Sequence, residues 1–428
     1  MQQKEFKVGG AGAVSTLIVL TLLLLMNQAD RSILSISLQP IKTAFGMTDT
    51  QAGSLVSLFI LGIAIFTIPV SIFGDRWARR KLVSVMALVW SIFTLTTGLA
   101  TQVWNLAASR FMVGAGEAGY VTAGMSWVGL SFKKEMRSII MGIFSVGGII
   151  GAMIGMIAGG WIIATTHDWR NAFYYFAIPG VFLAVCAYFL PDYKSFRREG
   201  EGILSKAFFK GWRDFLKVRT FWLSTAGVAL FHFSVQGSTA WTAALLIRQF
   251  GLDTMQAGLT YGGTGIATIA GMLLGGFIAD RWQKRSGNGR PYVIIISIAL
   301  NLASLFLTYS LLVNRSLALF TAGLWAMAFF FGIVTPIYLA VGLDVTPLHV
   351  RVSAIGLSNF LIQITGATLG PILVGIISDA AGGGAAGINT GILCMGALSV
   401  IGLIIYLAVP RYYPADAARI SDRALAEK

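Results

Sequence analysis

The chain alternates long apolar stretches with short polar ones along most of its 428 residues. Clear examples of the apolar stretches are Ser15–Met26, Phe59–Phe73 and Ile139–Ile163. Each predicted span approaches the roughly 20 residues that a helix needs to cross about 30 Å of hydrocarbon. Soluble core helices do not come in such a series, so the pattern predicts an all-α integral membrane protein.

Turn and charge signals divide this pattern into twelve predicted transmembrane helices. Their approximate bounds are 13–40, 51–73, 82–100, 104–128, 138–163, 171–190, 220–247, 255–279, 291–313, 317–343, 353–377 and 388–409. The first span is long and polar near Asp30, where we expect it to bend or tilt. A charged stretch without a small-residue cleavage pattern follows its apolar run, which favours a retained span over a cleaved signal peptide.

The longest internal polar segment, Asp192–Arg219, divides the chain near its middle. We therefore expect a six-helix bundle over 1–191, a cytoplasmic linker over 192–219 and a second six-helix bundle over 220–428. Aromatic and basic residues alternate within the linker, which fits either an interfacial amphipathic stretch or a solvated linker with aromatic anchors.

The two halves repeat a charged motif. Asp75-Arg-Trp-Ala-Arg-Arg80 follows the second predicted span, and Asp280-Arg-Trp-Gln-Lys-Arg285 follows the eighth. A chance basic cluster would not reproduce the D-R-W order in equivalent loops. The repeat indicates internal duplication of the kind found in secondary transporters, and so predicts two pseudo-symmetric bundles.

The placement of the charges supports a membrane topology with both termini in the cytoplasm. Only 12% of the residues are charged, against about 25% in soluble proteins. With cytoplasmic termini, the basic residues concentrate on the cytoplasmic side, as the positive-inside rule requires. Six of the 32 basic residues fall elsewhere: Arg31, Lys42, Arg110, Arg170, Arg248 and Arg315.

Several other classes of protein are disfavoured. The net charge of +14 comes from short clusters between apolar runs, without a nucleic-acid-binding module. Cys186 and Cys394 lie in apolar runs and show no disulfide or metal spacing. No phosphate loop, H-E-x-x-H motif or convincing nucleophile–base set occurs, so we expect neither an enzyme nor an ATP-driven pump. We also expect a monomer that needs no metal or cofactor.

The loop motifs resemble those of the major facilitator superfamily, and the resemblance covers the whole chain. Its signature G-x-x-x-D-R-x-G-R-R is matched at Asp75, Arg76, Arg79 and Arg80, with Ser71 and Ala78 in place of the glycines. The second copy keeps Gly276, Asp280, Arg281 and Arg285. The family's R-x-x-x-G-x-G in span four is present as Arg110, Gly114 and Gly116, whereas the glycine–proline signature of antiporters is not met.

Within this superfamily, three stretches resemble the Spinster-like branch. They are Asp30-Arg-Ser-Ile-Leu-Ser35 running into Gln39-Pro-Ile-Lys42, then Thr48-Asp-Thr-Gln-Ala-Gly-Ser54, and Gly114-Ala-Gly-Glu-Ala-Gly-Tyr120. An Asp-Arg pair in span one also resembles the organic anion transporters. The resemblance implies the major facilitator fold, in which two six-helix bundles surround a central cavity, and proton-linked transport.

Four charged residues fall inside predicted spans: Asp30, Arg31, Arg110 and Glu117. A charge at that depth costs about 2.5–3.5 kcal/mol on insertion scales, so it normally faces a cavity or a partner. Arg110 and Glu117 share a helical face but lie roughly 10 Å apart along the axis, too far for a direct pair. We therefore expect their partners to come from another helix, and Asp30 with Arg31 can supply both signs.

These four residues carry our functional hypothesis. Asp30 and Glu117 would take up protons, while Arg31 and Arg110 would pair with them or with an anionic substrate. The alternative is a static lattice of ion pairs that holds spans one and four together.

Other candidates are weaker. His232 and Gln236 share a face of span seven with Thr239, and Asn359 and Gln363 share a face of span eleven. His232 could take up a proton, since its ordinary pKa lies near neutrality, or it could be a hydrogen-bonded packing residue. Tyr120 and Tyr338 could line a substrate cavity, or they could pack between helices.

The repeated motif suggests a cytoplasmic latch. Asp75 and Asp280 could each face a neighbouring helix N-terminus or the following Arg79 or Arg285. Such contacts could form in one conformation and break in the other, a role implied by the family resemblance. The alternative is a permanent helix cap.

Together these features predict a proton-coupled secondary transporter of an organic, anionic or amphiphilic small molecule that works by alternating access. Its partners would be that solute, protons and membrane lipids. An exporter or flippase for lysolipids or drugs is the alternative, and a non-transporting receptor is a more distant one. Short loops favour the plasma membrane of a bacterium, although Asn314-Arg-Ser316 is a formal glycosylation sequon.

Overall fold

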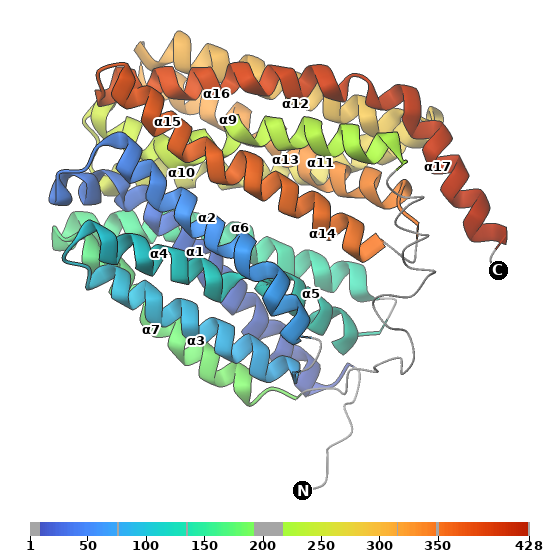
Figure 1. Cartoon of the computed structure of the whole chain (residues 1–428), viewed down its shortest axis with the longest axis horizontal. Coiled ribbons are helices and arrows are strands. Elements are labelled where there is room, and N and C mark those ends of the chain that lie inside the picture. Colours follow the sequence, from blue (N-terminus) through green and yellow to red (C-terminus); the bar gives the residue numbers. More distant parts are fainter. Residues whose placement is uncertain are drawn as a thin grey trace, which may run out of the picture. The chain divides into compact units, whose positions relative to one another are not determined.

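The computed structural model of the chain describes residues 9–74, 77–133, 136–191, 217–314, 316–347 and 351–426, and every regular element within these ranges is helical (Figure 1). The helices before the linker are α1 (Ala11–Phe45), α2 (Asp49–Gly74), α3 (Arg79–Gly98), α4 (Val103–Glu117), α5 (Tyr120–Ser131), α6 (Arg137–Thr166) and α7 (Trp169–Tyr188). Most of the predicted linker lies outside the described residues.

The helices after the linker include further long apolar segments. They are α9 (Arg219–Phe250), α10 (Thr254–Gly262), α11 (Thr264–Arg285), α12 (Gly289–Ser310), α13 (Leu317–Asp344), α14 (Arg351–Ile362), α15 (Thr368–Ala380), α16 (Gly384–Tyr406) and α17 (Val409–Ala426). A short 3₁₀ turn, η2 (Leu312–Asn314), follows α12, and a π-helical turn, η3 (Gln363–Ala367), joins α14 to α15.

Ten helical stretches of the described chain are long and apolar enough to cross a membrane. The two predicted spans missing from this set correspond to α4 with α5 and to α9. α4 is only 15 residues long, and α9 is long but carries polar side chains such as His232 and Gln236. Each of the twelve predicted spans therefore has a helical counterpart, and the two that are missing from the set of ten carry candidate site residues.

The prediction of a continuous helix over 104–128 was wrong. α4 stops at Glu117 and α5 starts at Tyr120, because Gly119 between them adopts a left-handed conformation with φ of +83°. Residues with a side chain rarely adopt this conformation. The break puts the acidic side chain of Glu117 in the last residue of a helix.

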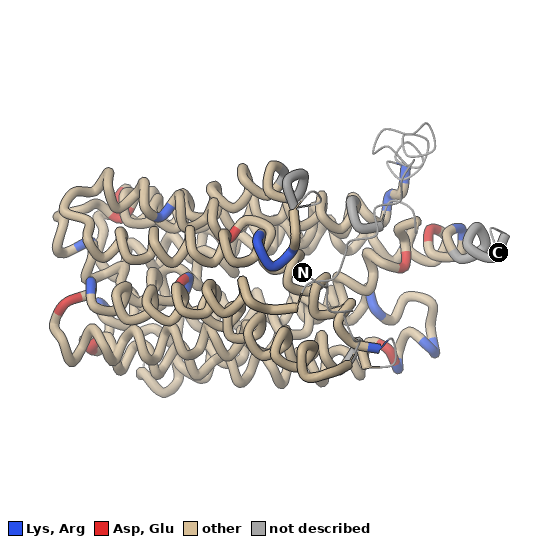
Figure 2. The backbone as a smooth tube through the Cα atoms, turned by 90° about the horizontal axis from the view of Figure 1, so that it is seen from below, with Lys and Arg blue, Asp and Glu red and all other residues tan. Residues whose placement is uncertain are grey.

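The chain forms two compact units, which do not coincide with the two halves of the sequence. Unit 1 comprises Met1–Phe196 and Ala240–Gly265, and unit 2 comprises Arg197–Thr239 and Ile266–Lys428. The last third of α9, together with α10, therefore packs with the helices that precede the linker. In both units, charged residues lie mainly near the ends of the helices (Figure 2).

Glycines bring the helices of unit 1 into close contact. α1 packs along α6, α3 along α7, and α2 along α4. A Cβ atom on Gly114 of α4 would collide with the carbonyl oxygen of Phe59 on α2, and one on Gly62 of α2 would collide with the carbonyl oxygen of Phe111 on α4. The two glycines thus permit backbone contact between α2 and α4 in both directions, which is how small residues stabilise helix pairs in membranes.

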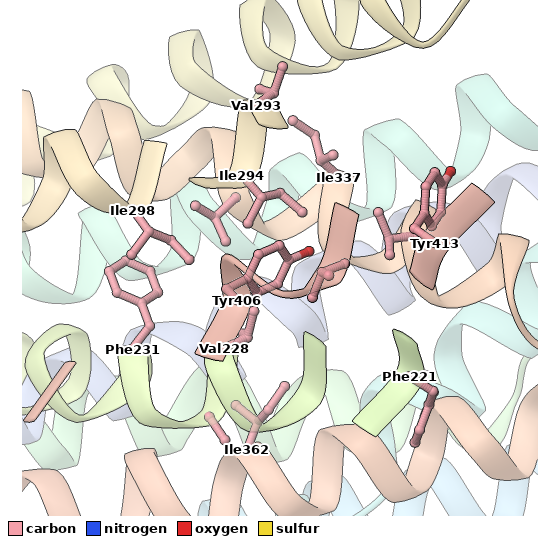
Figure 3. Close-up of a cluster of buried hydrophobic side chains, with 14 of the residues drawn as sticks. Phe221, Val228, Phe231, Val293, Ile294, Ile298, Ile337, Ile362, Tyr406 and Tyr413 are labelled. Carbon is pink, nitrogen blue, oxygen red and sulfur yellow. The ribbon is translucent and has the colours of Figure 1, made fainter. Parts of the chain in front are cut away.

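Unit 2 has its own apolar core (Figure 3). α9 contributes Phe221, Val228 and Phe231, α12 contributes Val293, Ile294 and Ile298, and α13, α14, α16 and α17 contribute Ile337, Ile362, Tyr406 and Tyr413 respectively. The core thus extends onto the C-terminal helix. Because Val409, Tyr413 and Ile420 are buried, one face of α17 is part of the packed unit.

Substituting Gly114 with alanine should destabilise the protein by about 1–3 kcal/mol, because the added methyl group has to push α2 away. Thermal unfolding of the purified protein measures this. Gly142→Ala on α6 is the control, since no atom lies within 4 Å of the position that its Cβ would take. Equal unfolding temperatures for the two variants would contradict the close α2–α4 contact.

Candidate functional site

Two buried ion pairs connect α1 to α4 within unit 1. Nη2 of Arg110 lies 2.9 Å from Oδ2 of Asp30, and Nη2 of Arg31 lies 2.8 Å from Oε2 of Glu117. Nε of Arg31 donates a second hydrogen bond of 2.8 Å to the same oxygen of Glu117. The partners that the sequence analysis expected from span one are therefore present, and each pair is neutral.

The geometry of the helices explains this crossed pairing. Asp30 and Arg31 are adjacent on α1, whereas Arg110 and Glu117 lie two turns apart on α4. Since neighbouring residues of a helix point in different directions, the two residues of α1 serve different partners. Arg110 and Glu117 are separated along α4, and the long side chains of Arg31 and Arg110 reach far enough to make both pairs.

Three uncharged residues complete the cluster, and sequence reasoning missed them. Thr94 of α3 donates a hydrogen bond of 2.8 Å to Oδ1 of Asp30. The ring of Phe59 on α2 has its centroid 5.3 Å from Cζ of Arg31 and 5.3 Å from Cζ of Arg110, and the ring of Phe173 on α7 lies 5.8 Å from Cζ of Arg110. Cation–π contacts at these distances stabilise a guanidinium group that has lost its water.

The sequence signal for one of these residues lies in the family motif. Gly114 follows Arg110 by one turn and allows the backbone of α2 to contact α4 at Phe59. The motif R-x-x-x-G thus brings the Phe59 ring to its own arginine. No comparable signal marks Thr94 or Phe173, because threonine and phenylalanine are common in the spans.

The two arginines differ in their access to solvent. The side chain of Arg110 is fully buried, whereas 29% of the side-chain surface of Arg31 is exposed. Both carboxylates are almost completely buried. Arg31 is therefore the arginine of the cluster that has exposed side-chain surface.

The cluster retains unused hydrogen-bonding capacity. Within the described part of the chain, no protein group bonds to Nε or Nη1 of Arg110, or to Oε1 of Glu117. Buried polar atoms of this kind are costly unless water or a ligand meets them. The arrangement of donors and acceptors therefore suits a water molecule, a proton or a polar substrate group.

Tyr120 sits differently from the other candidates of unit 1. Its hydroxyl group donates a hydrogen bond of 2.6 Å to the carbonyl oxygen of Leu20, and its ring packs edge-on against Trp90. The residue is fully buried. These contacts favour packing between α5, α1 and α3 over contact with a substrate.

Within unit 2, the contacts of His232 and Tyr338 are also satisfied by protein groups. Nδ1 of His232 lies 2.9 Å from the carbonyl oxygen of Val228, and its ring packs against Phe231 and Phe331. The hydroxyl group of Tyr338 lies 2.7 Å from Oγ of Ser358 and 3.2 Å from Oγ1 of Thr225. Both residues remain partly exposed, so either could still touch a substrate.

The remaining candidates of unit 2 lie near an irregular turn. Gln363 begins η3, and a Cβ atom on Gly366 in this turn would collide with Cβ of His232. π-helical turns often occur at functional sites. Asn359 is exposed one turn earlier, and Gln236 of α9 is partly exposed one turn after His232. The binding roles of these residues stay predictions.

One of the two proposed latch aspartates, Asp280, is described, and it contacts the start of a neighbouring helix and not the following arginine. Asp75 lies outside the described residues, so its contact with Arg79 stays a prediction. Asp280 pairs with Arg290, whose Nη2 lies 2.8 Å from Oδ1 of Asp280, and not with Arg285. Arg285 follows Asp280 by five residues on α11 and points to another side of the helix, while Arg290 lies at the start of α12, where the chain folds back.

This contact belongs to a larger network on unit 2. Nη1 of Arg290 also lies 2.6 Å from Oδ2 of Asp344, which accepts a hydrogen bond of 2.6 Å from the hydroxyl group of Tyr413 on α17. Burial, together with the hydrogen bond to Asp344, raises the pKa of Tyr413, which therefore stays a donor. The network joins α11, α12, α13 and α17. Among the described residues, no cluster of side chains could hold a metal ion.

A double-mutant cycle can test the buried pair. Asp30→Asn should destabilise the protein by about 3–5 kcal/mol, because it leaves the guanidinium group of Arg110 buried without a counter-charge. Adding Arg110→Gln should recover part of that loss. Denaturant unfolding measures both effects, and Asp168→Asn with Arg170→Gln provides an exposed pair as control. Additive effects of Asp30→Asn and Arg110→Gln would contradict the pairing.

Comparison with known proteins shows the family to which the chain belongs. Residues 20–367 match the model of the family described as Major Facilitator Superfamily. An MFS-type efflux pump of Mycolicibacterium smegmatis is 26% identical over 400 residues, which cover 92% of each chain. The cis,cis-muconate transport protein of Acinetobacter baylyi is 28% identical over 277 residues, 62% of this chain and 65% of the relative.

The fold has a close counterpart among solved structures. A bacterial homologue of the human lysosomal transporter Spinster, solved in an inward-facing and unoccupied conformation, superposes with a TM-score of 0.81. The match covers 95% of this chain and 99% of that one, at 21% sequence identity. The chain therefore belongs to the Major Facilitator Superfamily, whose members are membrane transporters of small molecules and not enzymes.

Proposed function

We propose that the chain is a proton-coupled secondary transporter that moves an organic, anionic or amphiphilic molecule by alternating access. The observation that carries this proposal is the pair of buried ion pairs between α1 and α4, one of which has a partly exposed arginine. Ionisable groups buried in a membrane protein commonly serve ion or substrate pathways.

Glu117 is the better candidate for the coupling proton. When a proton neutralises Glu117, Arg31 loses its counter-charge but remains 29% exposed, so water or an anionic solute can replace the carboxylate. When a proton neutralises Asp30, Arg110 stays fully buried and unpaired, which costs far more free energy. Proton binding at Glu117 would thus free Arg31 for a cargo anion, and proton release would return Arg31 to its partner.

This exchange gives proton binding a way to favour one conformation. A ligand shifts an equilibrium only as far as its affinities for the two states differ. The charge on Glu117 decides whether α1 and α4 are held together at Arg31, so protonation changes the energy of that contact. Asp30 with Arg110 would keep the same two helices connected throughout.

Other residues have supporting roles in this proposal. Gln236, Asn359 and Gln363 of unit 2 have exposed surface and would offer hydrogen bonds to the cargo, as would His232 and Tyr338. On the cytoplasmic side, the network of Asp280, Arg290 and Asp344 would act as the latch in place of the expected contact with Arg285. Both termini would lie in the cytoplasm of a bacterial cell, with the chain in the plasma membrane.

A second candidate is an exporter of lysolipids or drugs. The similarity to the efflux pump extends over 92% of both chains, whereas the similarity to the muconate transport protein covers 62% of this one. The same ion pairs would then couple proton entry to the exit of an amphiphile.

The variant Glu117→Gln should abolish proton-driven uptake. The neutral amide that replaces the carboxylate beside Arg31 can neither bind nor release a proton. Uptake into proteoliposomes under an imposed pH gradient measures this, with thermal unfolding as the check on the fold. Asp168→Asn, which removes a half-exposed carboxylate elsewhere in unit 1, should transport normally. Unchanged coupling in the folded Glu117→Gln protein would refute the coupling role.

The class of substrate can be tested with the same proteoliposomes. We expect uptake of monocarboxylates, dicarboxylates or sugar acids, and a faster rate when a proton gradient is present. Arg31→Gln should reduce this uptake at least tenfold, since the cargo loses its exposed cation. Movement of fluorescent lysolipids without any carboxylate uptake would instead support the exporter.

A further inference from the structure

A buried asparagine lies on α1 one turn before the residues that form the two ion pairs. Asn27 is fully buried, and within the described part of the chain no protein group bonds to its Nδ2 or its Oδ1. A carboxamide can donate two hydrogen bonds and accept two. Burying such a group without any of these bonds is costly. The side chain of Asn27 therefore calls for a polar partner that is not a protein group.

Asn27 lies on the side of α1 that faces away from α6. A Cβ atom on Gly151 of α6 would collide with the backbone of Leu25, and one on Gly155 would collide with the backbone of Ala29. These contacts mark the side of α1 that packs on α6. With 3.6 residues per turn, Asn27 lies about 160° around the helix from both Leu25 and Ala29.

Around the helix, Asn27 falls between the two ion-pairing residues of α1. The same spacing puts it about 60° from Asp30 on one side and about 40° from Arg31 on the other. Asp30 binds Arg110, and Arg31 binds Glu117. The amide of Asn27 therefore projects between the directions of the two pairs.

Along the helix axis, Asn27 also falls between the two pairs. Asp30 binds Arg110 of α4, whereas the carbonyl oxygen of Leu20 accepts a hydrogen bond from Tyr120, which begins α5. α1 therefore runs antiparallel to α4 and α5. Asn27 lies about 4.5 Å from Asp30 in the direction of Leu20, while α4 ends roughly 10 Å beyond Arg110.

The polar atoms that remain unbonded around this position are complementary. Among the described residues, no protein group bonds to Nε or Nη1 of Arg110, which can only donate, or to Oε1 of Glu117, which only accepts when the carboxylate is ionised. The amide of Asn27 can do both. Water also donates and accepts, so ordered water between these three buried side chains would satisfy all of them.

We propose that Asn27 is a positioning residue for the coupling proton, and that its amide holds ordered water against Oε1 of Glu117 and the unbonded nitrogens of Arg110. The proposal deepens the proposed function and rests on Glu117 as the proton site. Nε and Nη2 of Arg31 both point at Oε2 of Glu117. Oε1 is therefore the oxygen that is open to a proton, and it is the oxygen that the water meets.

The water serves both charge states of Glu117. When Glu117 is ionised, the water donates a hydrogen bond to Oε1. When Oε1 carries the proton, its O–H donates a hydrogen bond to the water, which turns over and donates to Oδ1 of Asn27. An amide permits this reversal because it offers a donor and an acceptor on one side chain. An apolar residue at position 27 would leave the new O–H without a partner.

Infrared difference spectroscopy of the purified protein in lipid nanodiscs tests the proposal without any cargo. Lowering the pH should produce the C=O band of the protonated Glu117 carboxyl group, which is identified by its loss in Glu117→Gln. Asn27→Leu fills the space of the water with apolar atoms. The band should move to higher frequency in this variant, as it does when a carboxyl group loses a hydrogen bond.

Two control variants separate this effect from a general change of packing. Asn27→Ser keeps a donor and an acceptor and leaves room for water, so its band should stay at the frequency of the parent. Asn301 is a buried asparagine of unit 2 whose Nδ2 binds the carbonyl oxygen of Met327, and Asn301→Leu should also leave the band in place. If Asn27→Leu does not fold, the smaller Asn27→Val replaces it. An unshifted band in the folded apolar variant would overturn the proposal.

A double-mutant cycle provides a second measurement that does not need Glu117 to take up a proton. The combined effect of Asn27→Leu and Glu117→Gln on the unfolding equilibrium constant should differ about threefold or more from the product of the single effects, because both residues bind the same water. Asn301→Leu with Glu117→Gln should give the simple product.

The two measurements separate this proposal from the proposed function. If Glu117→Gln removes no carboxyl band, Glu117 does not take up a proton over that pH range and its coupling role fails. The cycle then decides on the water site alone, and a simple product of the Asn27→Leu and Glu117→Gln effects would overturn it.

Discussion

An ionised side chain within a membrane needs a counter-charge, and this constraint organises unit 1. With both termini in the cytoplasm, six basic residues do not fall on the cytoplasmic side as the positive-inside rule would have them. Five of them have a carboxylate within ion-pair distance in the structure: Arg31, Lys42, Arg110, Arg170 and Arg248. These five exceptions to the topology rule therefore make specific contacts, and four of the five pair with a buried or almost completely buried carboxylate.

Close packing of helices supplies what the charges need to stay in place. Gly62 and Gly114 let α2 touch α4, and the contact puts the centroid of the Phe59 ring 5.3 Å from Cζ of each of two arginines. A larger residue at either glycine would separate the helices and withdraw the ring. The arginine and the glycine of the R-x-x-x-G motif thus act together, one as the charge and the other as the space that lets its neighbour approach.

The irregular points of the helices coincide with polar chemistry. α4 ends at Glu117, η3 begins at Gln363, and α2 and α10 each start from a capping box next to a contact with another helix. A regular helix uses its own backbone groups and presents side chains at set intervals. A break frees backbone groups and redirects side chains, which suits sites where contacts between residues have to form and break.

The sequence by itself determined the membrane class, the number of spans, the internal duplication and the need for partners from span one for Arg110 and Glu117, because apolar length, charge placement and helical spacing are local properties. It did not reveal Thr94, Phe59 or the pairing of Asp280 with Arg290. It also did not reveal that the end of α9 and α10 pack with the first half of the chain. These depend on which helices meet and how closely, and such contacts between distant segments are decided only when the whole chain packs.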